Sequence, residues 1–275
     1  MITTVPAVDK AVAILETIRD RDGGWMTIAE MARQLELSKS TVHAILNTLK
    51  ARGYVEQDPV TKKYGLAARC LELGYAYRSR LRLVDLFNSI AIKVSSECEE
   101  TIYLAILNGT DVIYIGKMES PHAVRMASNV GTRLPAHATA LGKSLLADLP
   151  EEHIDTLYHN YHFVARTPKG ISDLAGLKRQ LVEVRRLGYS ADRREYWEDV
   201  ECVAAPIRDE KGRAIAAMSI ALPTSRMVPG RIDKLATLIK SATAEMSLAL
   251  GYRAVAPEAT LPQGKSESVT TTERV

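Results

Sequence analysis

Two short amphipathic segments joined by a tight turn constrain the fold of this chain more than any other feature. They lie in TIAEMARQLELSKSTVHAILNTLKARG, residues 27–53. Apolar residues recur at helical spacing in the first segment, at Ile28, Met31, Ala32 and Leu35. They recur again in the second segment, at Val42, Ile45, Leu46 and Leu49. With a turn at Glu36-Leu37 between them, the two segments are typical of a helix-turn-helix.

Side-chain oxygens stand at the start of each predicted helix. Thr27 and Glu30 form a capping-box pair, and Ser38 can cap the second helix. Such oxygens accept hydrogen bonds from the backbone N–H groups that have no partner inside the helix. We therefore expect the two helices to begin directly after Thr27 and Ser38.

The second helix has two faces of different chemistry. Once its apolar residues turn to a core, the residues left outside are polar or cationic, with no acid among them: Lys39, Ser40, Thr41, His43 and Asn47. A helix with such residues near its N-terminus can enter the major groove of DNA, where asparagine pairs with adenine through two hydrogen bonds. The alternative is an ordinary solvated surface of an amphipathic helix.

A β-hairpin and an additional helix complete the pattern. Two β-prone runs, residues 54–57 and 63–66, flank Asp58-Pro59, and Lys62 and Lys63 stand at or near the hairpin tip. A preceding helix is predicted from Val8, Ala11, Val12, Leu15 and Ile18, and it ends at Asp22-Gly23-Gly24. Together these elements predict a winged helix-turn-helix, whose wing would lie against the phosphate backbone. The candidate DNA-contacting residues are Thr27, Ser38, Lys39, Ser40, Thr41, His43, Asn47, Lys62 and Lys63.

Positive charge is concentrated in the segment that contains the predicted DNA-binding face. The net charge of +3 and the pI near 8.7 do not by themselves identify a nucleic-acid binder. Residues 38–65, however, contain five bases and only two acids, Glu56 and Asp58. The bases are Lys39, Lys50, Arg52, Lys62 and Lys63.

Length and composition indicate a two-domain globular protein. With 275 residues, 46% of them hydrophobic and 25% charged, the chain is long enough for two cores. Cys70, Cys98 and Cys202 are odd in number and widely spaced, which argues against disulfides or a cysteine-based zinc site. Neither a signal sequence nor an apolar stretch long enough for a membrane helix occurs, so we expect a cytoplasmic protein without membrane association.

The remaining chain reads first as helix and then as strands. A linker helix is expected to about Ser79 and a second helix from Arg82, and their apolar residues require a partner surface, either in the same chain or in a second subunit. Strands are predicted at 101–107, 112–117, 124–127, 202–208 and 214–222. Asn108-Gly109 is predicted to form the hairpin turn between the first two. Helices are predicted at 138–149, 151–158, 172–188 and 229–250.

This pattern predicts an α+β fold: an N-terminal winged helix-turn-helix, a linker helix, and a C-terminal antiparallel sheet flanked by helices. The expected division is residues 1–66 for the DNA-binding domain, 67–80 for the linker, 81–252 for the second domain and 253–275 for a disordered polar tail.

Three stretches carry a family resemblance. They are residues 7–65, GTRLPAHATALGKSLLA at 131–147, and LGYSADRREYWEDVECVAAPIRDEKGRAIAAMSIALP at 187–223. Together they resemble the IclR family of bacterial transcriptional regulators over about residues 5–252. The resemblance implies a winged helix, a linker helix, a ligand-binding domain like a GAF or PAS fold, and a homodimer that can pair into a tetramer.

The resemblance also implies an effector pocket, in which a small organic or aromatic acid lies between the sheet and the helix that carries Gly142-Lys143-Ser144. Position by position, its polar and backbone contacts fall on Ala140, Leu141, Asp192, Cys202, Ser219 and Ala221, and its apolar lining falls on Ala123, Met126 and Leu134. Backbone N–H groups at a helix start would suit a carboxylate, whereas Asp192 would meet a donor on the ligand. Two departures from relatives are Ala221 in place of a serine and Ala44 in place of an arginine, which leave the ligand and the operator sequence open.

Signals for an enzyme are weak. Leu141-Gly142-Lys143-Ser144 ends like a phosphate-binding loop, but His137 occupies the position where that motif needs glycine. His153, His159 and His162 lack the i, i+4 spacing of a zinc helix. We therefore expect no metal, no cofactor and no catalytic residue, and a regulator that binds double-stranded DNA at a near-palindromic operator and senses a carboxylate or phenolic metabolite. The alternative is a small-molecule enzyme using Cys202 or Asp192 in the same cleft.

Overall fold

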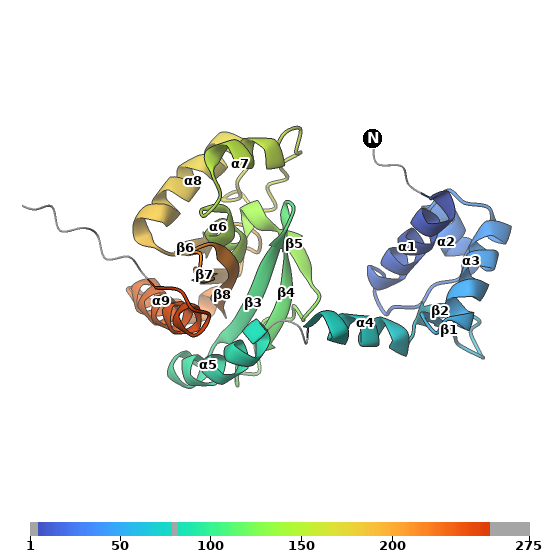
Figure 1. Cartoon of the computed structure of the whole chain (residues 1–275), viewed down its shortest axis with the longest axis horizontal. Helices are drawn as coiled ribbons and strands as arrows, with labels where there is room; N and C mark the ends of the chain where they lie inside the picture. Colours follow the sequence, from blue (N-terminus) through green and yellow to red (C-terminus); the bar gives the residue numbers. More distant parts are fainter. Residues whose placement is uncertain (1–4, 79–81, 254–275) are drawn as a thin grey trace, which may run out of the picture. The chain divides into compact units, whose positions relative to one another are not determined.

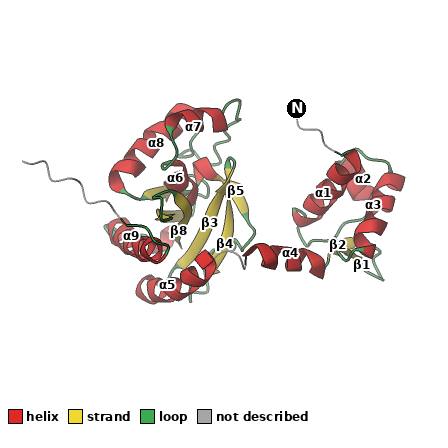
Figure 2. Ribbon diagram, viewed as in Figure 1, coloured by secondary structure: helices red, strands yellow, loops and turns green. Residues whose placement is uncertain are grey.

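The computed structural model describes residues 5–78 and 82–253. It divides into two compact units, Met1–Asp85 and Leu86–Val275, which Figure 1 shows by residue number and Figure 2 by secondary structure. The predicted end of the linker at residues 79–80, the predicted first residue of the second domain and the predicted tail beyond Arg253 lie outside the described residues. The boundaries given above for the four segments remain predictions.

The first unit is a winged helix-turn-helix. It contains α1 (Pro6–Arg19), α2 (Ile28–Gln34), α3 (Lys39–Ala51), the antiparallel pair β1 (Val55–Gln57) and β2 (Tyr64–Leu66), and α4 (Ala68–Arg78). All of these elements were predicted. The buried face of α1 differs from the predicted pattern, because Ile14 and Ile18 are fully buried whereas Val8 and Val12 are exposed. The core of this unit comprises Ile14, Ile18, Met26, Met31, Ala32, Val42, Leu46, Val55 and Tyr64.

Both predicted helix caps are present. The Thr27 hydroxyl accepts the Glu30 N–H at 3.2 Å, and a Glu30 carboxylate oxygen accepts the Thr27 N–H at 2.8 Å, which completes the capping box. The Ser38 hydroxyl accepts the Thr41 N–H at 3.1 Å at the start of α3. Between the helices, Glu36 adopts a left-handed conformation with φ of 54°, which turns the chain sharply.

The second unit is built on a six-stranded antiparallel sheet of order β5-β4-β3-β8-β7-β6. Its strands are β3 (Thr101–Asn108), β4 (Asp111–Met118), β5 (Arg133–Pro135), β6 (Ser190–Arg193), β7 (Val200–Arg208) and β8 (Ala214–Pro223). Gly109, with φ of +60°, forms the predicted turn between β3 and β4. The predicted α+β class is confirmed.

Helices cover both faces of this sheet, as Figure 1 shows. On one face lie α5 (Arg82–Cys98) and α9 (Arg231–Ala249), and α9 packs on β7 and β8. On the other lie the 3₁₀ turn η1 (Ala136–Ala138), α6 (Ala140–Leu146), α7 (Glu151–Leu157) and α8 (Leu174–Leu187); a second 3₁₀ turn, η2 (Thr224–Arg226), follows β8. The alternation of side chains along the strands therefore supplies two apolar layers.

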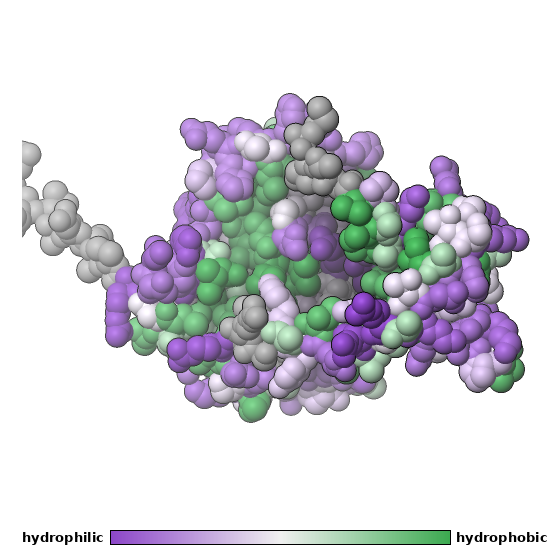
Figure 3. Space-filling model, turned by 45° about the vertical axis from the view of Figure 1, so that its right-hand side comes forward, coloured by the Kyte–Doolittle hydropathy of each residue, from purple (hydrophilic) through white to green (hydrophobic). Residues whose placement is uncertain are grey.

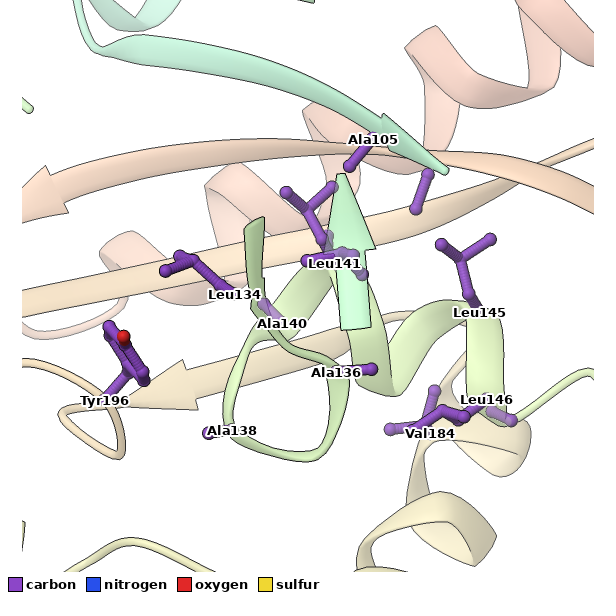
Figure 4. Close-up of a cluster of buried hydrophobic side chains, with 14 of the residues drawn as sticks. Ala105, Leu134, Ala136, Ala138, Ala140, Leu141, Leu145, Leu146, Val184 and Tyr196 are labelled. Atoms are coloured by element: carbon purple, nitrogen blue, oxygen red, sulfur yellow. The ribbon is translucent and has the colours of Figure 1, made fainter. Parts of the chain in front are cut away.

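The core between α6 and the sheet is shown in Figure 4. In this view Tyr196 and Leu134 lie at one end of the cluster, Leu141 lies in the middle, and Leu146 and Val184 lie at the other end. Gly142 permits the close approach of α6 to η1, because a Cβ at this position would lie 2.1 Å from the carbonyl oxygen of Ala136. The first turn of α6 is thereby held beside the sheet.

Several predicted elements differ from the observed ones. Residues 124–127 form no strand: the carbonyl of Val124 accepts a hydrogen bond from the Arg226 side chain in place of a ladder partner, and the carbonyl of Ser128, directly after this segment, accepts one from the Tyr103 hydroxyl. The helix predicted at 138–149 is shorter: Thr139 caps its start and Arg185 binds the carbonyls of Ala147 and Leu149 after its end. The short edge strands β5 and β6 were not predicted.

Candidate functional site

The polar face of α3 is exposed. Lys39, Ser40, His43 and Asn47 are all exposed and Thr41 is half-buried, whereas Val42 and Leu46 are completely buried. This is the distribution that the sequence predicted for a helix with one face in the core and one face free. The face therefore offers hydroxyl, amide, imidazole and ammonium groups to the surroundings.

Part of the hydrogen-bonding capacity at the start of α3 is used within the helix. Besides capping Thr41, the Ser38 hydroxyl lies 2.9 Å from the Ser40 hydroxyl and 2.8 Å from the Thr41 hydroxyl. The Thr27 hydroxyl likewise donates to Glu30 at 2.8 Å. The side chains of Thr27 and Ser38 therefore serve to cap the N-termini of α2 and α3.

The β1-β2 hairpin presents its two lysines at a tip that is closed by side-chain hydrogen bonds. Asp58 closes the tip by accepting hydrogen bonds from the backbone N–H groups of Val60 and Thr61 and from the Thr61 hydroxyl. Lys62 has a left-handed backbone, with φ of 59°, and its side chain is exposed, while that of Lys63 is half-buried. The Asp58 carboxylate is thus consumed by the turn, where those hydrogen bonds lower its pKa.

The second unit contains a cavity between the sheet and the start of α6. The empty space in and around it, with the open mouth included, is about 450 Å³. It is lined by Tyr103, Tyr114, Met126, Ser128, Leu134, Thr139, Ala140, Leu141, Asp192, Tyr196, Trp197, Val200, Cys202, Ser219 and Ala221.

Eight of the nine predicted pocket residues line this cavity. The exception is Ala123, which is exposed and lies outside the lining of this cavity. Residues 121–124 form a bend on the surface, and the chain reaches the cavity only from Met126. Sheet register brings the polar residues together, since Asp192 pairs with Cys202, Cys202 with Ala221, and Ser219 with Tyr103.

The sequence-based prediction missed the aromatic part of the lining. Tyr103 and Tyr114 lie on neighbouring strands with ring centroids 4.6 Å apart, and Tyr196 and Trp197 meet edge to face at 4.9 Å. The tyrosines at 103 and 114 each stand in an alternating β-pattern, which was a signal for a common face. Tyr196 and Trp197 lie in a loop, where no periodic pattern in the sequence predicts which way a side chain points.

Asp192 is the one acid in this lining, and it is only 4% exposed. Burial raises the pKa of its carboxyl to about 7, since removal from water disfavours the charged form. The Glu195 N–H, which donates to Asp192 at 2.7 Å, and the nearby Lys143 ammonium oppose this increase in pKa. At neutral pH the carboxyl can therefore both donate and accept hydrogen bonds.

Lys143 lies behind this lining and is completely buried. Its Nζ contacts both carboxylate oxygens of Glu195, at 2.6 and 2.7 Å, and lies 2.7 Å from the Gln180 side-chain oxygen and 2.7 Å from the Ala191 carbonyl. The lysine of Gly142-Lys143-Ser144 is therefore a structural group that joins α6 to α8 and to the end of β6. No phosphate-binding role is left for it.

Features of an enzyme or a metal site are weak in the described part of the chain. Burial raises the pKa of the Cys202 thiol well above its ordinary value, so this thiol stays protonated, whereas the thiolate is the nucleophilic form. Within residues 5–78 and 82–253, no three His, Cys, Asp or Glu side chains are grouped in a way that could hold a metal ion. Over the same residues, no helix is long and apolar enough to cross a membrane.

Known proteins match both units. Residues 7–59 match the IclR helix-turn-helix domain, and residues 75–248 match the family described as bacterial transcriptional regulator IclR C-terminal. The HTH-type transcriptional regulator XynR of Escherichia coli (strain K12) is 32% identical over 250 residues, which covers 91% of this chain and 99% of XynR.

Solved structures agree in fold. An IclR transcriptional regulator from Alicyclobacillus acidocaldarius has a TM-score of 0.80 at 27% identity, covering 90% of this chain and 100% of that protein. An IclR homologue from Microbacterium hydrocarbonoxydans, solved in complex with 4-hydroxybenzoate, has a TM-score of 0.76 at 26% identity, covering 89% of this chain and 98% of that protein. With both domain matches and near-complete coverage, the chain belongs to the IclR family of bacterial transcriptional regulators.

Proposed function

We propose that this regulator binds operator DNA through α3 and the β1-β2 hairpin and that a small molecule in the cavity of the second unit controls this binding. The observation that carries the DNA part is the exposed face of α3, which presents Lys39, His43 and Asn47 without any acid among them. Asn47 would read a base edge in the major groove, and Lys62 and Lys63 would contact phosphates.

The proposed effector is a small aromatic or organic acid or a phenol. Four aromatic side chains in the cavity lining, Tyr103, Tyr114, Tyr196 and Trp197, support a planar ligand, because rings pack favourably face to edge or offset. The Microbacterium relative, whose structure holds 4-hydroxybenzoate, supports the same chemical class. Ala140, Leu141, Asp192, Cys202, Ser219 and Ala221, with Met126 and Leu134, are the proposed contacts.

We further propose a homodimer that acts in the cytoplasm and has no catalytic activity. Exposed apolar side chains on α4, at Leu71, Leu73, Tyr75 and Tyr77, support self-association. Figure 3 also shows apolar residues gathered on one face of the larger unit, with hydrophilic residues around them. The protonated Cys202 thiol supports a binding role for the cavity in preference to nucleophilic catalysis.

Mobility-shift measurements with the full chain test the DNA part of this proposal. DNA fragments from the source genome are selected by the protein, and affinity is measured for the selected sequence and for random DNA of equal length. Specific complexes are typically about 10³-fold or more tighter than nonspecific ones, so we expect a ratio of that order. Equal affinity for both DNAs at physiological salt would reject the proposal.

A further inference from the structure

The Lys143 ammonium has three N–H groups, and the protein itself occupies all of them. Glu195, Gln180 and the Ala191 carbonyl each lie within 2.7 Å of Nζ. Among the described residues that line the cavity, none is a lysine, arginine or histidine. Within this lining, a carboxylate at the Asp192 end would therefore meet no side-chain cation; Arg166, whose guanidinium lies 4.6 Å from the centroid of the Tyr196 ring, stands outside the lining.

The Lys143–Glu195 pair also spans two walls of the cavity. Ala140 and Leu141, one turn before Lys143 on α6, form one wall. Asp192 in β6 and Tyr196 and Trp197 in the loop after it stand on either side of Glu195 in the sequence and form the other. Because Lys143 is completely buried and Glu195 is nearly so, the ion pair is shielded from solvent, and loss of one partner would leave an uncompensated charge.

We propose that the Lys143–Glu195 ion pair positions these two walls and sets the ligand preference of the cavity, so that the effector presents a hydroxyl or amine to Asp192 and not a second carboxylate. The inference rests on the proposed effector function of the cavity. Lys143 and Glu195 do not contact the ligand in this proposal; they hold the residues that do, and in this way they decide which ligands bind.

The charged and titratable groups near Asp192 come from four elements or segments. Lys143 of α6 lowers the pKa of the Asp192 carboxyl and Glu195 raises it, while Cys202 of β7, Tyr114 of β4 and Tyr196 interact with the same carboxyl. Replacing Glu195 by glutamine keeps the backbone N–H that Asp192 accepts but leaves Lys143 without its carboxylate partner. The uncompensated positive charge of Lys143 would then favour the charged form of Asp192.

A pH titration of tryptophan fluorescence tests the positioning role without any ligand. The chain has two tryptophans, so Trp25→Phe leaves Trp197 in the cavity wall as the single reporter. We expect a transition near pH 7 that Asp192→Asn abolishes and that Glu195→Gln moves to lower pH by about one unit, as expected for removal of a neighbouring negative charge. Lys178→Met is the control, because it removes a lysine paired with Glu151 and Asp155 on the surface, and it should leave the midpoint unchanged. An unchanged midpoint in Glu195→Gln, or an equal shift in the control, overturns the proposal.

Ligand discrimination is measured by calorimetry with 4-hydroxybenzoate and with terephthalate, in which a carboxylate replaces the hydroxyl. Wild type should prefer 4-hydroxybenzoate by about tenfold or more, and Glu195→Gln should reduce this preference because the positive charge of Lys143, no longer neutralised by Glu195, attracts the second carboxylate. Equal affinity of wild type for the two compounds would overturn the proposal. Operator binding is measured on the same samples, so a failure of the proposed DNA function is seen separately from a failure of this inference.

Discussion

Asn47 and Lys62 should contribute to DNA binding in different ways, because one faces outward from α3 and the other stands at the hairpin tip. Asn47→Ala should cost about 1 to 3 kcal/mol on the selected operator while leaving random DNA almost unaffected. Lys62→Ala should weaken both and flatten the dependence of log affinity on log salt by about one unit for each lost phosphate contact. Fluorescence anisotropy over a salt series measures both effects, and equal losses on both DNAs for the two variants would contradict this assignment.

Asp192 should make the stability of the second unit depend on pH. Its pKa is about 7 in the folded protein and about 4 in the unfolded chain, so the folded state binds the extra proton between these values. The stabilisation that this proton gives is fully present below about pH 4 and is lost as the pH rises through 7. Asp192→Asn should therefore increase the free energy of unfolding at pH 8 by on the order of 2 to 3 kcal/mol, and much less at pH 5. Urea unfolding at both pH values measures this difference, and an equal effect at pH 5 and pH 8 would contradict it.

At the level of single residues, the sequence predicted which side chains face outward, but it did not predict which distant residues contact one another. The outward residues of α3 follow from helical spacing alone, because the buried positions fix the other face. Lys143 could not be placed in the same way. Its partners Gln180, Ala191 and Glu195 are distant in sequence, and no local pattern predicts that they converge on one ammonium.

Among the elements, α6 should be the least tolerant of added volume at its glycine. A Cβ at Gly142 would lie 2.3 Å from the Ala136 Cα and 2.1 Å from its carbonyl oxygen, so Gly142→Ala must push α6 away from η1. We expect a loss of more than about 3 kcal/mol in the stability of the second unit, as overpacking of backbone against backbone is costly.

Gly74→Ala in α4 is the matched control for this change. A Cβ there would meet no atom within 4 Å, so the substitution should stabilise the helix by up to about 1 kcal/mol through helix propensity. Thermal unfolding followed by circular dichroism compares the two variants. A neutral effect of Gly142→Ala would show that α6 is not held against η1 as described.

At the element level, long amphipathic segments were predictable and short edge strands were not. The helices of the first unit and the β3-β4 and β7-β8 hairpins follow from periodicity and turn residues. β5 and β6 have only three and four residues, too few for alternation to be visible, and sheet pairing with β4 and β7 defines them. Residues 124–127 have the composition of a strand, but the carbonyl of Val124 accepts a hydrogen bond from Arg226, a side chain far away in sequence.

At the scale of the whole molecule, the exposed apolar side chains of α4 should form a contact between two subunits. Leu71 and Tyr75, four residues apart, share one side of the helix, and Leu73 and Tyr77 share another side about 200° away. Leu71 is 76% exposed and Tyr75 is 68% exposed within the chain, so a second subunit would remove apolar surface from water. Leu71→Glu with Tyr75→Glu should convert a dimer into monomers and weaken operator binding by at least about 10²-fold, since a half-site alone binds weakly. Light scattering that finds wild type monomeric at micromolar concentration, with full operator affinity, would contradict this.

The composition and the order of predicted elements were enough to place an α+β unit after a winged helix-turn-helix. The eight predicted residues that line the cavity came from the family resemblance and not from composition or element order. Glu195, Tyr196 and Trp197 lie in the loop between β6 and β7, and the chain order alone does not determine how such a loop closes over the sheet.

The response of operator binding to a ligand in the cavity tests the central claim most directly. Operator affinity is measured by anisotropy with increasing 4-hydroxybenzoate and related hydroxy acids, for wild type, Asp192→Ala and Ser219→Leu. We predict that all three proteins bind the operator with the same affinity without ligand and that only wild type changes its affinity when ligand is added, because a ligand shifts only those states that it binds unequally. An equal ligand response in all three proteins, or no response of wild type to any compound that calorimetry shows to bind it, would contradict the account.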